Sequence, residues 1–317
     1  MAVQNLKPNV ISSSSIHYAD LIKSVRDKNL KSLLARKKLH LVLDLDNTLL
    51  HSSTMLKLTK YDRDYLQRSV GVKLIEEKKL FQWNFQRNDS VTCLPARGRN
   101  DHWVTKLRPN VETFLKEASA VFEFSIFTLG TCKYARKMLD LLDPEGLYFA
   151  HSQVITREDI RSKPLKKGLD LVWAHERVVL VVDDLKEVWK DDNAKSVIKI
   201  APYEFFDDES SNKKSWSRNW ADESEKYGEL ARVLRELKKI HKEFYNVEEG
   251  QDDYESRDVR DAIEEVKRKF FLQGTKEGMS KHAQETINEI DECFKSMGLN
   301  CRTNGPNVIL QTNHMVM

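Results

Sequence analysis

Short apolar runs and helix-like repeats alternate along the first two thirds of the chain. The runs at residues 39–45, 121–128 and 177–184 are apolar and end in polar residues, which is typical of buried strands in a parallel sheet. Residues 199–206 (KIAPYEFF) give a fourth strand candidate. Together these segments predict the core of a sheet.

Helical spacing fills the intervals between these runs. Apolar residues up to Leu34 predict a lead-in helix, and residues 107–119 predict another helix with Pro109 at its first position. Thr131 can cap a third helix, which carries Tyr134 among its apolar positions. Because strands alternate with helices, we expect right-handed crossovers and an α/β fold with a doubly wound parallel sheet.

Two regions depart from this alternation. A polar stretch at about residues 57–101 is interpreted as an insertion, and its segment LFQWNFQ (80–86) predicts a strand or hairpin. After residue 206 the chain is acidic and Ser-rich, and it then predicts helices at about 222–246, 256–272 and 280–297. We therefore divide the chain into a leader with the lead-in helix (1–38), a core domain (39–206) and a helical extension (207–317).

Composition narrows the range of partners. With 52 basic and 49 acidic residues the net charge is +3, which gives no electrostatic footprint for nucleic acid or for an acidic membrane. No run approaches the roughly 18 apolar residues of a membrane span, and the first residues lack the apolar core of a secretory signal. We therefore expect a protein that stays inside the cell. The four cysteines lack CxxC spacing, which predicts reduced thiols and no zinc site.

Polar residues stand at the ends of three predicted strands. Asp44 and Asp46 lie at the end of the first strand, Thr128 ends the second, and Asp183 and Asp184 end the third. In open α/β sheets, ligands bind in the crevice beyond the carboxyl ends of the strands. Four carboxylates in one crevice repel each other and need a cation. Since the ligands are all oxygen atoms, Mg²⁺ is the expected ion.

Such a site is suited to phosphoryl transfer. An aspartate can attack phosphorus and form an aspartyl-phosphate, which splits a difficult hydrolysis into two easier steps. A second carboxylate two residues on can protonate the leaving oxygen and later deprotonate the attacking water. A hydroxyl donor and a lysine should hold the remaining phosphate oxygens.

The motifs resemble those of a known phosphatase family. DLDNT (44–48) is similar to the D-x-D-x-T signature of haloacid dehalogenase-type phosphatases, which have a Rossmann-like sheet. The wider pattern resembles the Fcp/Scp-type branch, which dephosphorylates the C-terminal domain of RNA polymerase II. The supporting stretches lie between about residues 35 and 206, and they are KKLHLVLDLDNTLLHS, TKLRPNVETFLKEAS, FTLGTCKYARKMLDLLD, KKGLDLVWAHERVVLVVDDLKEVW and YEFF.

The resemblance implies roles for the four aspartates. Asp44 would be the nucleophile and a magnesium ligand. Asp46 would be the general acid and base and, through its backbone carbonyl, also a magnesium ligand. Asp184 would complete the magnesium site, and Asp183 would hold the motif lysine or a metal-bound water.

The resemblance also implies a set of phosphate-binding residues. Thr128, in FTLG, would bind the phosphate. The motif lysine falls on Lys167, with Lys166 and Lys163 as substitutes in the same lysine-rich stretch. Arg157, upstream of these lysines, is expected to touch the same phosphate.

The family implies a substrate and a compartment as well. Its members typically hydrolyse phosphoserine in heptads of the YSPTSPS kind, in a shallow groove to which residues 61–100 would contribute. We therefore expect a magnesium-dependent protein serine phosphatase that acts on a phosphorylated Ser-Pro-rich segment in the nucleus, with the cytoplasm as an additional compartment. Residues 222–271 resemble the helical region that precedes the BRCT domain of plant members, but the residues that follow do not resemble a BRCT domain.

Two other functions stay open from the sequence. One is a phosphatase for small phosphoesters, which the lack of a recognisable cap domain disfavours, and the other is a catalytically weak paralogue that binds phosphoproteins.

Two histidines and three tryptophans could have either a functional or a structural role. His51 is interpreted as structural rather than as an acid or base, and His40 as a strand-edge residue. Trp103, Trp173 and Trp189 could line a peptide groove, although burial is the usual fate of tryptophan and is the expectation here.

Overall fold

The fold is built on a five-stranded parallel sheet. The computed structural model describes residues 14–68, 79–84, 102–207, 215–219, 221–246, 256–276, 300–304 and 307–311. The strand order is β6-β5-β1-β7-β8, and every neighbouring pair is parallel. The strands are β1 (Leu39–Leu43), β5 (Phe122–Phe127), β6 (Gln153–Ile155), β7 (Val179–Asp183) and β8 (Val197–Lys199). The α/β parallel fold expected from the sequence is confirmed.

Successive residues of the central strands enter two different hydrophobic clusters. In β1, Leu41 belongs to the larger cluster and Val42 to the smaller one. In β7, Leu180 and Val181 divide in the same way. This is the two-residue period of a strand, and because both faces are buried the strand sequences are apolar throughout.

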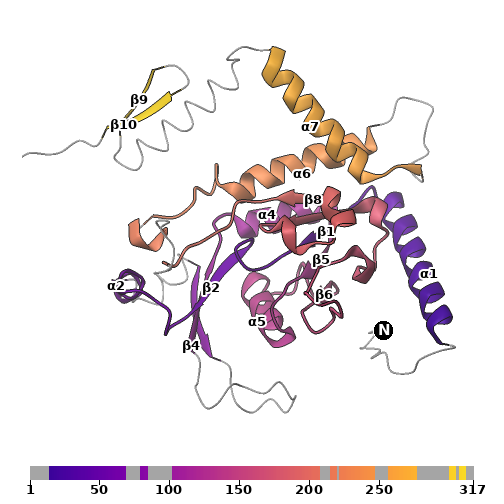
Figure 1. The fold of residues 1–317 in the computed structure, drawn as a ribbon, viewed down its shortest axis with the longest axis horizontal. Helices are drawn as coiled ribbons and strands as arrows, with labels where there is room; N and C mark the ends of the chain where they lie inside the picture. Colours follow the sequence, from indigo (N-terminus) through magenta and orange to yellow (C-terminus); the bar gives the residue numbers. More distant parts are fainter. Residues whose placement is uncertain are drawn as a thin grey trace, which may run out of the picture.

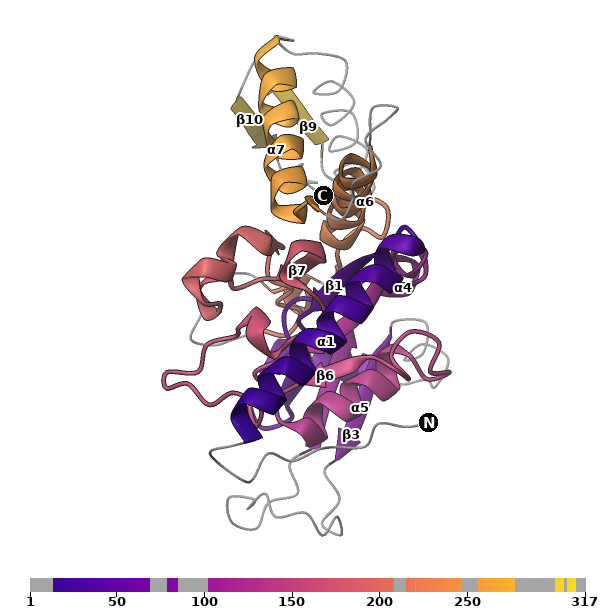
Figure 2. The ribbon, with the colours of Figure 1, turned by 90° about the vertical axis from the view of Figure 1, so that its right-hand side faces the viewer.

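Helices cover one face of the sheet, and short 3₁₀ turns and loops cover the other. The larger cluster includes apolar residues from α1 (Ser14–Ala35), α4 (Val111–Ser119), α5 (Cys132–Leu142), α6 (Glu229–Tyr245) and α7 (Val259–Lys276). The smaller cluster includes Leu169, Val172 and Trp189 from irregular segments. Figures 1 and 2 show α6 and α7 packed together at one end of the molecule, next to the sheet.

A second, antiparallel sheet forms the insertion. Its order is β2-β4-β3, with β2 (Leu50–Thr54), β4 (His102–Leu107) and β3 (Leu80–Asn84), and α2 (Lys60–Arg68) follows β2 in the chain. In Figure 1 this sheet lies to the left of the parallel sheet. The strand predicted in LFQWNFQ is confirmed, whereas β2 and β4 were not predicted.

Three elements differ from the sequence prediction. The fourth core strand is β8, so residues 200–206 are not a strand; instead Tyr203, Phe205 and Phe206 are buried beneath the antiparallel sheet. Helix α4 begins at Val111, after Asn110 in a left-handed conformation (φ 67°), so Pro109 lies before the helix. The missed strand β6 forms one edge of the parallel sheet.

The remaining predictions concern the two ends of the chain. The lead-in helix is present as α1, and two of the three predicted C-terminal helices are present as α6 and α7. The third, at 280–297, lies outside the described residues. A two-stranded sheet pairs β9 (Asn300–Asn304) with β10 (Asn307–Gln311). The division of the chain at residue 206 stays a prediction.

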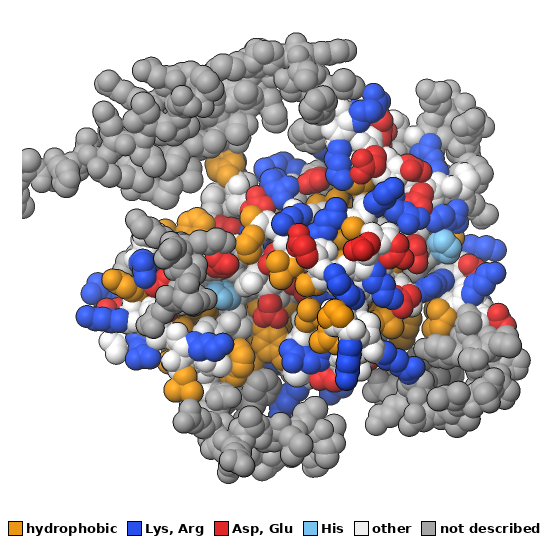
Figure 3. Space-filling view, viewed as in Figure 1, with side chains coloured by type: hydrophobic (Ala, Val, Ile, Leu, Met, Phe, Trp, Pro, Cys, Tyr) orange, Lys and Arg blue, Asp and Glu red, His pale blue; other side chains and the backbone are white. Residues whose placement is uncertain are grey.

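The surface charges agree with the nearly balanced charge of the sequence, and the described helices agree with its lack of a long apolar run. Figure 3 shows basic and acidic side chains intermingled over the coloured part of one face. Among the described helices, none has the length and apolar character that crossing a membrane requires.

Candidate active site

The order of the strands brings the predicted site residues to one edge of the sheet. β1 lies between β5 and β7, so the residues that end these three strands are neighbours. Asp44 directly follows β1, and its backbone N–H donates to the Val182 carbonyl in β7 (3.1 Å). Thr128 directly follows β5, and Asp183 ends β7. The predicted convergence of these strand ends is therefore present in the structure.

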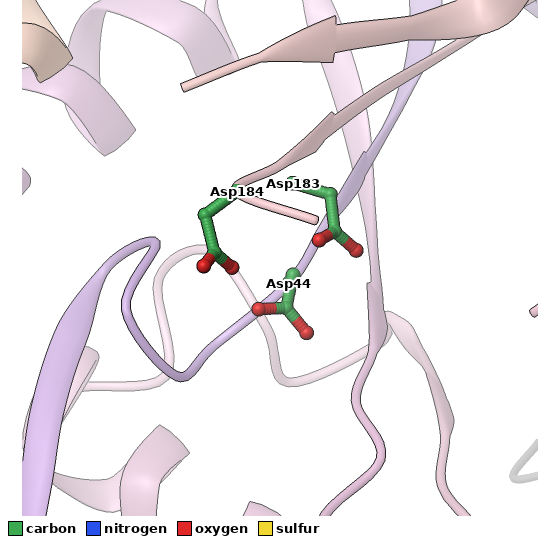
Figure 4. Close-up of side chains that lie close together, drawn as sticks. All are labelled: Asp44, Asp183 and Asp184. Atoms are coloured by element: carbon green, nitrogen blue, oxygen red, sulfur yellow. The ribbon is translucent and has the colours of Figure 1, made fainter. Parts of the chain in front are cut away.

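Three carboxylates form a buried cluster at this edge. Oxygen atoms of Asp44, Asp183 and Asp184 all lie within 4.8 Å of one another. Figure 4 shows the three side chains close together at the ends of their strands. The residues are 6%, 1% and 5% exposed. Burial raises the pKa of Asp44 well above its usual value, and burial together with the charge of Asp183 raises the pKa of Asp184 to about 6. A hard divalent cation such as Mg²⁺ fits this oxygen-only donor set and would relieve the repulsion.

Lys167 joins the cluster as its counter-charge. Its ammonium Nζ donates to Asp44 Oδ1 at 2.6 Å and to Asp183 Oδ2 at 2.7 Å, and the residue is only 1% exposed. Burial acts to lower the pKa of Lys167, but the two carboxylates outweigh it and the pKa is raised. The lysine is therefore charged at neutral pH.

Backbone pairing determines which lysine of the lysine-rich stretch enters the site. The Lys167 N–H donates to the Val188 carbonyl (2.8 Å), and the Lys190 N–H donates to the Lys167 carbonyl (2.9 Å). Lys166 instead donates to the backbone carbonyl of Glu187. The structure therefore brings Lys167 to the carboxylates and places Lys166 outside the cluster; the third candidate, Lys163, is exposed.

Asp183 is fixed by more than the lysine. The indole Nε1 of Trp189 donates to Asp183 Oδ2 (2.9 Å), and the Leu185 N–H donates to Oδ1 (2.8 Å). Trp189 is buried as expected, and Lys167 Nζ lies 5.6 Å from its ring centroid. The polar role of the indole was not predicted, and no motif in the sequence indicates it.

Asp46 occupies a separate position beside an aromatic group. The hydroxyl of Tyr134 donates to Asp46 Oδ1, and its oxygen lies 2.9 Å from Ser52 Oγ, within hydrogen-bond distance. The carboxylate of Asp46 is not part of the three-residue cluster. The rings of Trp83 and Trp103 lie with their centroids 6.1 Å from that of Tyr134. The sequence predicted Tyr134 only as a helix residue, so its contact with Asp46 was missed.

The ionisation of Asp46 depends on several opposing effects. Burial raises its pKa, and this is the largest effect. The hydrogen bond from Tyr134 and the positive charges of Lys167 and Arg157 lower the pKa, but they do not cancel the effect of burial. Asp46 is therefore easier to protonate than an exposed aspartate, which is the property that a general acid requires.

The turn after β5 positions the two remaining predicted residues. Thr128 is 1% exposed, and its Oγ1 accepts the Gly130 N–H (2.9 Å). A Cβ at Gly130 would lie 2.7 Å from Tyr134 Cδ1, which explains the glycine of FTLG. The exposed side chain of Arg157 reaches this turn through Nε, which donates to the Leu129 carbonyl (2.6 Å).

The loop after β1 is also joined to the cluster. Asn47 has a left-handed conformation (φ 59°), and Thr48 follows it with no exposed surface. The hydroxyl of Thr48 accepts the Asp184 N–H (3.2 Å) and lies 3.5 Å from Asp184 Oδ1, to which it donates. The threonine of the D-x-D-x-T motif therefore links this loop to the end of β7.

The other candidate side chains have structural contacts. His51 Nδ1 accepts the N–H groups of Phe205 (2.9 Å) and Phe206 (3.1 Å), in agreement with a structural role. His40 lies in the central strand β1 and bonds Ser125 Oγ (2.7 Å), so its prediction as a strand-edge residue was wrong. Trp103 is half-buried, and Trp173 is 45% exposed, so its predicted burial was also wrong.

Comparison with known proteins identifies the family. The family model of NLI interacting factor-like phosphatases matches residues 39–248, which is more than half of the chain. The chain belongs to this phosphatase family. The family predicted from the motifs is therefore confirmed.

The curated relatives are longer than this chain. The RNA polymerase II C-terminal domain phosphatase-like 4 of Arabidopsis thaliana is 37% identical over 288 residues, which cover 86% of this chain and 60% of the relative. An RNA polymerase II C-terminal domain phosphatase of Schizosaccharomyces pombe is 30% identical over 182 residues, which cover 57% of this chain and 23% of the relative. The match therefore spans less than two thirds of either relative.

A solved structure confirms the fold of this phosphatase-family chain. The structure of Fcp1, described as an essential RNA polymerase II CTD phosphatase, superposes with a TM-score of 0.58 and 25% sequence identity. The match covers 77% of this chain and 74% of the solved chain. The parallel sheet with its antiparallel insertion is thus shared with a known phosphatase.

Proposed function

We propose that this protein is a magnesium-dependent protein serine phosphatase that works through an aspartyl-phosphate intermediate. The observation that carries the proposal is the buried group in which Lys167 Nζ contacts Asp44 (2.6 Å) and Asp183 (2.7 Å), beside Asp184. A buried cluster of carboxylates around one lysine is costly for stability, and a phosphate-binding metal site accounts for it.

Asp44 is the nucleophile in this mechanism. Its Oδ1 is held by Lys167, which leaves the other carboxylate oxygen to attack the phosphorus of phosphoserine. A bond forms between that oxygen and phosphorus while the bond from phosphorus to the serine oxygen breaks. The leaving serine oxygen takes a proton from Asp46, whose raised pKa suits it to this step.

The second step returns Asp44 to its free form. Asp46, now a carboxylate, takes a proton from a water molecule that attacks the phosphorus of the aspartyl-phosphate. The bond between phosphorus and Asp44 breaks, and inorganic phosphate leaves. Tyr134 holds Asp46 in both steps through its hydroxyl hydrogen bond. This bond fixes the carboxyl group that gives a proton in the first step and takes one in the second.

Three side chains would bind the transferred phosphoryl group. Lys167 supplies a buried positive charge next to Asp44. Thr128 Oγ1 accepts the Gly130 N–H, so its own proton can be donated to a phosphate oxygen. Arg157 adds a second positive charge beside Asp46. These groups act on the equatorial oxygens, where negative charge is concentrated in phosphoryl transfer.

Mg²⁺ would be held by Asp44 and Asp184, with Asp183 and the backbone carbonyl of Asp46 completing the predicted set. When bound, it neutralises charge on the phosphoryl group and permits the Asp44 carboxylate to approach the negatively charged phosphate ester. The oxygen-only composition of the cluster supports this choice of ion.

The proposed substrate is a phosphorylated Ser-Pro-rich segment, with the C-terminal heptads of RNA polymerase II as the first candidate. The names of the relatives from Arabidopsis thaliana and Schizosaccharomyces pombe support this choice, and they also support a nuclear location. No nucleic acid and no membrane are proposed as partners, in keeping with the net charge of +3.

The test is phosphate release from a heptad phosphoserine peptide, with Mg²⁺ or with EDTA. The intact protein should release phosphate only with Mg²⁺, and Asp44→Asn should release none although it folds. Sugar phosphates serve as the comparison substrates, because faster release from them would assign the protein to small phosphoesters. A folded protein that releases no phosphate from the peptide or from an aryl phosphate would refute the enzyme and leave a phosphoprotein-binding paralogue.

A further inference from the structure

A buried arginine lies directly behind the loop that carries the proposed catalytic aspartates. Arg108 follows β4, and its side chain has no exposed surface. Its guanidinium directs Nη1 to the carbonyls of Thr48 (3.1 Å) and Asn47 (3.4 Å), and Nη2 to the carbonyl of Ala201 (2.9 Å). A single side chain therefore joins the loop after β1 to the segment after β8.

The loop needs such support because its conformation is unusual. Asn47 has φ 59°, a left-handed conformation that costs free energy for a residue other than glycine. Its carbonyl also accepts the Tyr203 N–H (2.7 Å), and its own N–H donates to the Leu50 carbonyl (2.7 Å). The arginine adds hydrogen bonds to this carbonyl and to the next one, so it favours the observed form of the loop.

The counter-charge of Arg108 comes from far along the chain. Glu223 receives Nε on Oε2 (2.9 Å) and Nη2 on Oε1 (2.6 Å), a bidentate pair in which the carboxylate is 11% exposed. Glu223 lies in the segment before α6. Glu229, the first residue of α6, accepts the Ala201 N–H (3.0 Å), so the start of that helix is bonded to the same segment after β8. A planar guanidinium with two parallel bonds to a carboxylate has its orientation fixed as well as its charge balanced.

The chain of contacts continues from the loop into the carboxylate cluster. Thr48, whose carbonyl is bound by Arg108, uses its hydroxyl to bond both the N–H and Oδ1 of Asp184. Glu223 therefore reaches a proposed magnesium ligand through Arg108 and Thr48. Asp46 immediately precedes Asn47 and Thr48, whose carbonyls accept the hydrogen bonds of Arg108.

We propose that Arg108 and Glu223 form a positioning pair for the phosphatase site, through which the segment before α6 holds the loop that carries Asp46 and Thr48. This proposal rests on the proposed function. Neither residue touches the reacting atoms; both act through the carbonyls of Asn47 and Thr48. The activity of residues 39–206 then depends on a residue that lies beyond them.

The neighbouring acid supplies a matched control. Asp222 carries the same charge on the same segment, but it pairs with Lys106 (2.6 Å) and with the hydroxyl of Tyr203 (2.8 Å). These bonds anchor the segment, whereas the bonds of Glu223 reach the loop through a guanidinium. Asp222→Asn and Glu223→Gln therefore remove the same charge, but only Glu223→Gln changes the partner of Arg108.

The experiment compares wild type, Glu223→Gln and Asp222→Asn as full-length proteins. For each, kcat, KM and the Mg²⁺ concentration for half-maximal rate are measured with a phosphoserine peptide, at a temperature where all three are folded. Glu223→Gln should lower kcat, or raise the required Mg²⁺, by about tenfold, which is the usual effect of losing an outer-sphere partner. KM for the peptide should change less than twofold. Asp222→Asn should keep kcat and the Mg²⁺ requirement and change only the melting temperature.

A second measurement does not need activity. Amide hydrogen exchange of residues 44–50 should become faster in Glu223→Gln than in wild type and stay unchanged in Asp222→Asn. If the wild type proves to have no phosphatase activity, the proposed function fails while the exchange still decides the positioning role. If folded Glu223→Gln showed the exchange rates and the kinetics of wild type, the positioning role of Arg108 and Glu223 would be refuted. Equal losses of kcat in Glu223→Gln and Asp222→Asn would mean that the two acids contribute only to general stability. Should Glu223→Gln not fold, Glu223→Asp keeps the charge, shortens the reach and is tested in the same way.

Discussion

Lys167 Nζ lies 2.6 Å from Asp44 Oδ1, so the proposed phosphate-binding group and the proposed nucleophile are directly paired. The same ammonium holds Asp183 at 2.7 Å. An incoming phosphate must therefore compete for a lysine that two carboxylates share. Mg²⁺ bound to the carboxylates would weaken their hold and make the ammonium available to the phosphate.

Replacing Lys167 with glutamine should nearly abolish phosphatase activity. Loss of one oriented charge at a developing anion costs about 10²–10³ in rate. Removing one partner of a buried ion pair also costs about 3–5 kcal/mol, so Lys167→Gln should lower the free energy of unfolding in EDTA. Activity is measured by phosphate release, and stability by urea denaturation.

The matched control for this change is the adjacent lysine. Lys166 bonds a backbone carbonyl outside the cluster, so Lys166→Gln should keep most of the activity. If Lys166→Gln abolished activity and Lys167→Gln did not, the motif lysine would have to be reassigned.

Tyr134→Phe should shift the pH dependence of the reaction. The ring would still pack beside Trp83 and Trp103, but the hydrogen bond that lowers the pKa of Asp46 would be lost. The pKa of Asp46 should therefore rise further. Because Asp46 must be protonated to act as general acid, the fall of kcat/KM at alkaline pH should move to higher pH.

Ser52→Ala is the control for the tyrosine. It removes a hydroxyl that also bonds Tyr134 and leaves the bond between Tyr134 and Asp46 in place. Its alkaline limb should stay at the wild-type pH. An unshifted limb in Tyr134→Phe would show that another group controls this part of the profile.

The sequence predicted the site to the extent that local patterns and motifs encode it. Apolar runs that end in Asp44, Thr128 and Asp183 were enough to predict that these residues meet. Lys167 and Lys166 are adjacent and chemically alike, so only the pairing of Lys167 with Val188 and Lys190 distinguishes them.

Other features depend on contacts that no local pattern contains. Strand order is not encoded in a single strand, so His40 was assigned to an edge although β1 is central. The short sequence of β2 (LHSST) is largely polar and half-buried, so it gave no apolar alternation. The contact between Arg108 and Glu223 joins residues 115 positions apart.

The central position of His40 has a consequence for acid stability. Burial lowers its pKa from 6.5 to about 4. The unfolded chain therefore binds a proton between about pH 6.5 and 4 that the folded protein does not bind, so the His40 contribution to stability is lost as pH falls through this range. A shift of this size corresponds to about 3 kcal/mol. His40→Gln can keep a hydrogen bond to Ser125 but cannot titrate.

The measurement is urea denaturation of wild type and His40→Gln at several pH values between 4 and 7. Other groups, Asp184 among them, also titrate in this range, so the informative quantity is the difference between the two proteins. The wild type should lose stability relative to His40→Gln as the pH falls. A difference that stays constant with pH would show that folding does not lower the pKa of His40.

Asp184→Asn should separate the stability of the cluster from its ability to bind metal. The pKa of Asp184 is raised to about 6 by burial and by Asp183, so at pH 7.5 its negative charge destabilises the metal-free protein. Removing that charge should raise the melting temperature in EDTA.

In wild type, Mg²⁺ at a hundred times its Kd should add about 2.7 kcal/mol of stability. Asp184→Asn should lose most of this gain, because one of the three clustered carboxylates is gone. Calorimetry with Mg²⁺ and with EDTA measures both effects, and Lys163→Gln, a charge change at an exposed position, should show neither. An equal gain from Mg²⁺ in wild type and Asp184→Asn would place the metal elsewhere.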